Sequence, residues 1–153
     1  MTSQSHLTPY GDEYPTCLET RASLRIYPGA RHPDEVTALL HTAPTSIKVA
    51  GEAVTNRRGL TRIIRTNGWF LSSEGHVVSK DLRRHLDWLL EQLVPARAGL
   101  MALQRETDVR MSVNCVWWSR SGHGGPTLWP AQMRALVDLD LECSFDVYFF
   151  GED

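Results

Sequence analysis

The stretch from Asn67 to Leu93 limits the fold of this chain most strongly, because it joins a short strand to an amphipathic helix. A polar turn with Gly75 at its bend separates the two elements. Ser79 is the expected N-cap, since its hydroxyl can accept hydrogen bonds from first-turn N–H groups, and Asp81 adds negative charge there. Apolar residues then recur at helical spacing, at Leu82, Leu86, Leu89, Leu90 and Leu93. This pattern predicts a helix that covers one face of a sheet.

Strict alternation of apolar and polar residues marks three further strands, because successive side chains of a strand point to opposite faces. These strands are expected at Arg21–Tyr27, Val109–Trp118 and Leu141–Phe150. Helical patterns lie between them, at Pro33 to about Pro44, Ala96–Gln104 and Pro130–Asp138. The segment Thr45–Ala50 is a candidate for one more short strand.

The order of these elements predicts an α+β fold. Pro33–Leu40 and Pro130–Val137 are weakly similar in sequence, and each lies between two strands. Two strand-helix-strand units suggest split β-α-β units of the ferredoxin-like plan, with a mostly antiparallel sheet and helices on one face. Residues 1–18 are polar and without a sustained period, which predicts a flexible N-terminal arm before a single α+β domain at 19–153.

Composition narrows the classes of function. The chain is 42% hydrophobic with a net charge of −2, which argues against a general nucleic-acid binder. No apolar run reaches the length of a membrane span, and the N-terminus lacks a secretory signal. The three cysteines are odd in number and far apart, which favours a reduced, cytoplasmic protein. The histidines show no metal-ligand spacing, so we expect neither a metal nor a cofactor.

One segment is distinctly basic. Gly51–Leu60 has turn-like composition and carries Arg57 and Arg58, and Arg62 and Arg65 follow closely. Its charges suggest a solvated hairpin whose edge is protected from pairing, which is the interpretation that we favour. An anion-binding site is the alternative.

Three groups of motifs resemble a known family. They are Pro33–Val36 with Leu39, Leu40, Pro44 and Thr45; Trp69–Ser73 before Ser79–Leu82 with His85, Leu86 and Trp88–Leu90; and Gly124–Leu128 leading to Phe145–Phe149. Together they resemble the bacterial domain-of-unknown-function family 4279, over roughly Arg21 to Phe150. The resemblance implies a shared fold and carries no assigned activity.

The open face of the expected sheet is the first candidate for binding. It should present Arg25, Tyr27, Asn114, Trp118, Asp146 and Tyr148. Tyrosine and tryptophan beside arginine are typical of binding surfaces, because they bury large areas and keep a polar contact. Alternatively, the aromatic residues pack under the arm or against each other, with Arg25 and Asp146 as a solvated pair.

Trp88 and the segment Ser121–Thr127 are two further candidates for a binding site. Trp88 lies about 120° from Leu82 on the helix, and so either packs under Ala96–Gln104 or meets another chain. The glycine-rich segment Ser121–Thr127 lets the backbone approach a ligand, and its His123 could act as an acid or base. The sequence shows no nucleophile paired with His123. A plain connection is therefore the favoured interpretation of that segment.

These observations favour a non-catalytic module that binds a protein through the open aromatic face, with an immunity-type protein as the narrower suggestion by analogy. Whether the chain is an enzyme stays open, with the balance toward no activity. One alternative is a small-molecule-binding or catalytic domain centred on Ser121–Thr127. Another is self-association, as a homodimer with its sheet faces packed together. A membrane partner is not expected.

Overall fold

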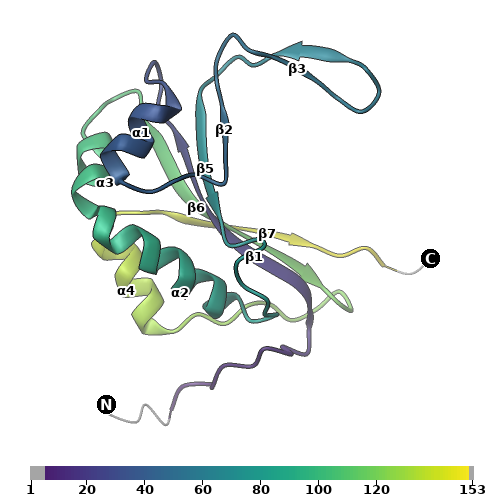
Figure 1. The fold of residues 1–153 in the computed structure, drawn as a ribbon. Helices are drawn as coiled ribbons and strands as arrows, with labels where there is room; N and C mark the ends of the chain where they lie inside the picture. Colours follow the sequence, from purple (N-terminus) through teal and green to yellow (C-terminus); the bar gives the residue numbers. More distant parts are fainter. Residues whose placement is uncertain (1–5, 152–153) are drawn as a thin grey trace.

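The alternating segments of the sequence form the strands of a sheet, and the helical patterns form its cover. The computed structural model describes residues 6–151 (Figure 1). Its elements are β1 (Cys17–Tyr27), α1 (Pro33–Leu40), β2 (Ser46–Lys48), β3 (Ala53–Thr55), β4 (Thr61–Ile63), β5 (Gly68–Ser72), α2 (Leu82–Leu93), the 3-10 turn η1 (Val94–Ala96), α3 (Arg97–Gln104), β6 (Arg110–Ser119), α4 (Pro130–Asp138) and β7 (Cys143–Tyr148).

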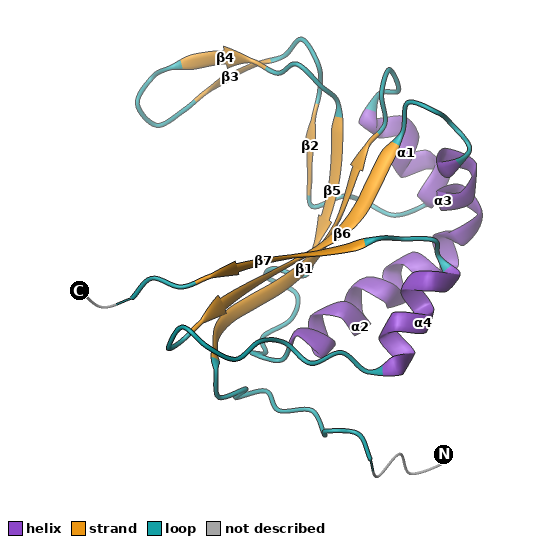
Figure 2. Cartoon of the chain, turned by 180° about the vertical axis from the view of Figure 1, so that it is seen from behind, coloured by secondary structure: helices purple, strands orange, loops and turns teal. Residues whose placement is uncertain are grey.

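The main sheet has the strand order β2-β5-β1-β6-β7. β1 is central and pairs antiparallel with β5 and with β6, while β2 pairs antiparallel with β5. β7 runs parallel to β6 at the opposite edge, and α4 makes the crossover between them. The helices lie together on one side of the sheet (Figure 2). The expected α+β class, with a mostly antiparallel sheet covered on one face, is confirmed.

The ferredoxin-like plan within that class is not confirmed. β5 and β6 both run antiparallel to β1 and lie on either side of it, so β5, α2, α3 and β6 form one split β-α-β unit. β6 and β7 are direct neighbours, so the second unit is not split. A ferredoxin-like sheet requires two split units, in which each pair of parallel strands encloses a strand of the other.

The core lies between the sheet and the helices. β1 contributes Ala22, Leu24 and Ile26, all fully buried. The leucine stripe of α2 covers them as expected, with every member at most 7% exposed. No helix within residues 6–151 has the length and apolar character needed to cross a membrane.

Three boundaries differ from the sequence expectation. Asp81, not Ser79, is the N-cap of α2, and its carboxylate accepts from the Arg83 N–H at 3.0 Å. A carboxylate at this position satisfies a free N–H and also lies at the positive end of the helix. β1 begins at Cys17, four residues before Arg21. α1 ends at Leu40, where His41 turns the chain with φ 53°, before Pro44 is reached.

The N-terminal segment approaches the start of α2. Residues 1–5 of the expected arm lie outside the described residues. Beyond them, the Gly11 N–H donates to Asp81 and the Lys80 N–H donates to the Asp12 carbonyl, both at 2.9 Å. The segment therefore makes specific backbone contacts with the helix N-terminus before β1 begins.

The basic segment forms the expected hairpin. β3 and β4 pair antiparallel as a separate two-stranded sheet, and all six of their residues are exposed. Figure 1 shows this hairpin projecting from the top of β2 and β5, on the side of the sheet away from the helices. It therefore overhangs the face that the helices leave open.

Candidate functional site

Six of the eight expected binding residues lie on the open face of the sheet. Arg25 and Tyr27 come from β1, Asn114 and Trp118 from β6, and Asp146 and Tyr148 from β7. The strand register places Trp118 opposite Tyr148, and Val116 opposite Asp146. The alternation of the sequence therefore directs these side chains to one side of the sheet, and all of them except Asn114 reach its surface.

The aromatic residues on this face form a row. The rings of Trp118 and Tyr148 stack with centroids 5.5 Å apart, and Tyr148 is parallel to Phe150 at 6.3 Å. The Arg21 guanidinium lies 5.0 Å from the Trp118 ring. Trp118 therefore has Tyr148 and Arg21 as neighbours, and Tyr148 has Trp118 and Phe150.

Asn114 has a different place from the one expected. Its side chain is only 3% exposed, and its Nδ2 donates to Ser144 Oγ at 3.1 Å and to Asp146 Oδ2 at 3.0 Å. It therefore orients Asp146 and does not itself meet a partner. Arg25 makes no ion pair with Asp146 or with any other carboxylate of residues 6–151.

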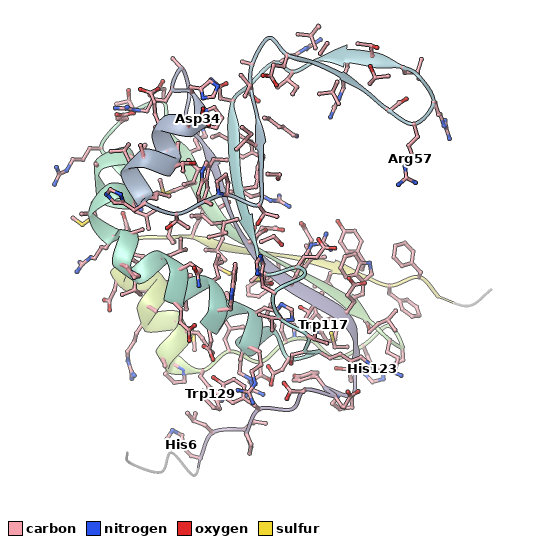
Figure 3. All side chains as sticks on the ribbon, viewed as in Figure 1. His6, Asp34, Arg57, Trp117, His123 and Trp129 are labelled. Atoms are coloured by element: carbon pink, nitrogen blue, oxygen red, sulfur yellow. The ribbon has the colours of Figure 1, made fainter. Side chains whose placement is uncertain are left out.

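A groove of about 670 Å³ opens between the hairpin and the sheet, and we call it the hairpin groove. Its floor comes from β1, β2 and β5, and its roof from β3, β4 and the residues after them. The hydrophobic part of the lining is Tyr27, Ile47, Val54, Ile64 and Phe70. The charged part is Arg21, Arg25, Lys48, Arg62 and Glu74. Arg57, at the tip of the hairpin, points back toward the sheet (Figure 3).

The hairpin groove is strongly positive in a chain whose net charge is −2. Four cations meet one acid there. That acid, Glu74, is 3.9 Å from Arg21, and both side chains are partly exposed, so the pair is weak. Lys48 lies 5.7 Å from the Phe70 ring. Arg25 and Arg62 have no acidic partner within residues 6–151 and are available to an anionic ligand.

The sequence did not indicate that Arg62 and Lys48 belong with the open face. Alternation placed Arg21 and Arg25 there, because both belong to one strand. The basic composition of the hairpin was visible, but nothing local to it showed that the hairpin returns over the sheet. The spacing of charges along a chain carries no information on such a long-range contact.

Trp88 and His123 lie away from the hairpin groove. Trp88 stacks on His76, which lies in the turn before α2, with ring centroids 4.7 Å apart. His123 is exposed in the loop after β6 (Figure 3), and its Nε2 is 3.1 Å from Ser121 Oγ. Neither residue is part of the lining of the hairpin groove.

Close packing accounts for Gly122 and Gly124 of the Ser121–Thr127 loop, and a Cβ at Gly122 would lie 3.1 Å from the Phe149 ring. Gly124 has φ +84°, and a Cβ there would lie 2.4 Å from Thr16 Oγ1. The Tyr14 hydroxyl donates to the Gly125 carbonyl at 2.8 Å. The absence of side chains lets this loop approach the N-terminal segment closely, which favours a plain connection.

A serine and a histidine that sequence reasoning did not pair lie inside the fold. The Ser73 hydroxyl accepts from the Ala22 N–H at 3.0 Å and donates to His85 Nδ1 at 2.7 Å. His85 Nε2 then donates to the Ser79 carbonyl at 2.8 Å. Burial lowers the pKa of His85. Because Ser73 is fully buried, no substrate reaches its hydroxyl, and the pair holds β5, β1 and α2 together.

No group of three His, Cys, Asp or Glu side chains within residues 6–151 is arranged as metal ligands would be. The model of one protein family, described as a domain of unknown function (DUF4279), matches residues 18–150. No curated protein matches the chain, and no solved structure does. The family match spans all strands and helices except the first residue of β1, and it confirms the resemblance seen in the motifs.

Proposed function

We propose that the hairpin groove of this chain, which belongs to the family described as a domain of unknown function (DUF4279), binds an acidic segment of a partner protein. The observation that carries the proposal is the excess of cations in the groove, where Arg25 and Arg62 have no acidic partner within residues 6–151. Carboxylates form charge-assisted hydrogen bonds with guanidinium groups, and Tyr27 and Phe70 offer apolar contacts between them.

A protein partner is favoured over a nucleic acid. Single-stranded nucleic acids bind to sheets by stacking bases on exposed ring faces. The faces of Trp118 and Tyr148 are directed at each other and at Arg21, so they are not free for bases. Ring edges and arginine side chains suit a peptide surface better.

The proposal involves binding without catalysis. Ser73 and His85 are enclosed, and Gly124 of the His123 loop packs closely on Thr16. Face-to-face packing of two copies is disfavoured, because the projecting hairpin would hold the two sheets apart. An immunity protein that occupies an acidic surface of a toxin would be one member of the proposed class. The proposed setting is the cytoplasm.

Fluorescence anisotropy with a labelled synthetic peptide of alternating glutamate and leucine tests the proposal. We expect saturable binding that weakens as salt is added, since screening reduces attraction between exposed charges. The charge-reversed variant Arg25→Glu, Arg62→Glu should weaken binding at least tenfold. Arg97→Glu, Arg134→Glu reverses two exposed arginines on α3 and α4, is the matched control and should bind as the parent does.

The same assay includes two further probes. A peptide with lysine in place of glutamate should not bind, and an oligothymidylate should bind more weakly than the acidic peptide.

The double variant Trp118→Ala, Tyr148→Ala removes the two stacked rings of the aromatic row. It should also weaken peptide binding, while unfolding stays cooperative. Equal binding by the parent and the Arg25→Glu, Arg62→Glu variant, or preference for the oligonucleotide, would overturn the proposal.

A further inference from the structure

The two edges of the main sheet differ in their protection. β2 at one edge is three residues long, ends at Lys48 and leads into the hairpin. β7 at the other edge is six residues long and carries neither lysine nor proline. Natural sheets usually protect an edge with short strands, charges or proline, because unpaired N–H and C=O groups otherwise pair with another chain. β7 therefore lacks the short length, the lysine and the proline that protect such an edge, and its one charged residue, Asp146, accepts a hydrogen bond from Asn114.

The backbone of β7 has free groups along that outer side. Val113 donates its N–H to the Glu142 carbonyl where the β6–β7 pair begins. In a parallel pair, alternate residues direct both backbone groups to the neighbouring strand. Ser144, Asp146 and Tyr148 therefore face β6, while the N–H and C=O groups of Phe145 and Val147 point away from the sheet. No other strand within residues 6–151 pairs with them.

The side chains of this edge are apolar and exposed on both faces. The exposed fractions are 43% for Phe145, 58% for Val147, 42% for Tyr148, 50% for Phe149 and 77% for Phe150. Figure 2 shows β7 running toward the C-terminus beyond the helices, which explains why the helix side of its far end is uncovered. An unpaired edge with apolar residues on both faces favours addition of another strand.

We propose that β7 pairs antiparallel with β7 of a second copy of this chain, with Val147 on the two-fold axis. A symmetric interface requires a surface that is complementary to itself. In this register Phe145 lies opposite Phe149 of the second copy, and Asp146 lies opposite Tyr148. The outward backbone groups of Val147 bond to the same groups of its copy. The two main sheets thereby become one continuous sheet of ten strands.

Competing registers are less favourable. An axis at Asp146 would place two carboxylates directly opposite each other, which destabilises a strand pair. An axis at Phe145 would place Phe149 opposite Leu141, which is already buried, and leave Phe150 without a partner. The axis at Val147 pairs Phe145 with Phe149 and Val147 with its own copy, and it keeps the two Asp146 side chains apart.

The size of this interface predicts a weak dimer. An aromatic side chain buries about 150–250 Å² when fully covered, so these partly exposed residues offer on the order of 400 Å² per copy. A stable complex typically buries about 800 Å² per partner. We therefore expect a dissociation constant on the order of 10–100 μM.

Sedimentation velocity of the full chain over a concentration range of about 1–300 μM measures this equilibrium. The parent should pass from monomer to dimer, and Val147→Lys should stay monomeric, because it places two ammonium groups at the axis. Ile63→Lys makes the same change at an equally exposed residue of β4 that does not line the hairpin groove, and it should dimerise as the parent does. A parent that stays monomeric throughout, or a Val147→Lys variant that still dimerises, overturns the proposal.

Oxidative cross-linking tests the register and does not depend on whether Val147→Lys folds. In a Cys143→Ser background, Val147→Cys should form a disulfide-linked dimer, since paired Cα atoms about 5.5 Å apart lie within disulfide range. Phe145→Cys should not, because the two introduced thiols would lie four residues apart along the strands. Cross-linking of Phe145→Cys in preference to Val147→Cys would contradict the proposed axis. Val147 faces away from the hairpin groove, so this result is independent of peptide binding.

Discussion

Burial sets the protonation state of His85. Its ring accepts from Ser73 and donates to the Ser79 carbonyl, which is the pattern of a neutral imidazole. Burial lowers the pKa of His85 below its ordinary value. The folded protein therefore holds fewer protons on this residue than the unfolded chain does between the lowered folded-state pKa and about 6.5.

This difference predicts that stability falls as the pH is lowered through that window. The stability from neutral His85 is fully present above about pH 6.5, and it decreases below it because the unfolded chain takes up the proton first. Thermal unfolding between about pH 7 and 5 measures the slope. His85→Gln should be less stable overall and show a shallower slope, while the exposed His123→Gln should behave as the parent. An unchanged slope in His85→Gln would argue against this assignment.

At the scale of elements, α1 and α3 approach each other through a glycine. A Cβ at Gly99 would lie 2.3 Å from the Leu39 carbonyl oxygen and 3.1 Å from Leu40 Cδ2. The first contact is with backbone, which cannot rotate away as a side chain can. The absence of a side chain at Gly99 therefore sets the distance between the two helices.

Gly99→Ala should destabilise the protein by about 1–3 kcal/mol, the usual cost of overpacking, despite the higher helix propensity of alanine. Urea unfolding measures the effect. Ala98→Gly, at the exposed neighbouring position, should also destabilise, by about 1 kcal/mol, because only propensity matters there. The two positions thus have opposite preferences, and a stabilised Gly99→Ala variant would show that the helices separate easily.

At the scale of the whole molecule, Arg83 joins parts of the chain that are far apart in sequence. It is fully buried, pairs with Asp81 through two hydrogen bonds of 2.9 and 2.7 Å, and donates to the Thr8 and Pro9 carbonyls. The rings of Tyr10 and Trp129 lie 5.3 and 5.1 Å from its guanidinium. Burial, together with a hydrogen bond to Asp87, raises the pKa of Tyr10 to about 12. Arg83 therefore anchors the N-terminal segment to α2.

Arg83→Ala should destabilise the protein by about 3–5 kcal/mol, because it leaves the buried Asp81 carboxylate without its partner. The N-terminal segment should also become sensitive to limited proteolysis, as read by mass spectrometry. Arg83→Lys keeps the charge but loses the paired hydrogen bonds, and should not restore protection. Asp81→Asn, Arg83→Met removes both charges and should cost less than Arg83→Ala alone. An equal loss of stability in Arg83→Ala and in Asp81→Asn, Arg83→Met would show that the ion pair is not the anchor.

The alternation of Arg21–Tyr27 and of Val109–Trp118 was sufficient to predict which side chains face the helices and which face outward. The leucine stripe of α2 was sufficient to predict the cover. Such periodicity is local, because a strand or a helix determines the faces of its own residues. The α+β class and the open aromatic face could therefore be predicted from the sequence.

The long-range placement of segments decided the hairpin groove, the burial of Asn114 and the free edge of β7. The basic hairpin became part of the candidate site only because the fold carries it over β1 and β5, so that Arg62 and Arg25 line the same groove. Asn114 was expected at the surface, but Asp146 and Ser144 enclose it. The parallel placement of β7 beside β6 produced the unprotected edge. The sequence by itself determined the elements and their faces, and tertiary packing decided which faces meet, because contacts between distant segments leave no local period.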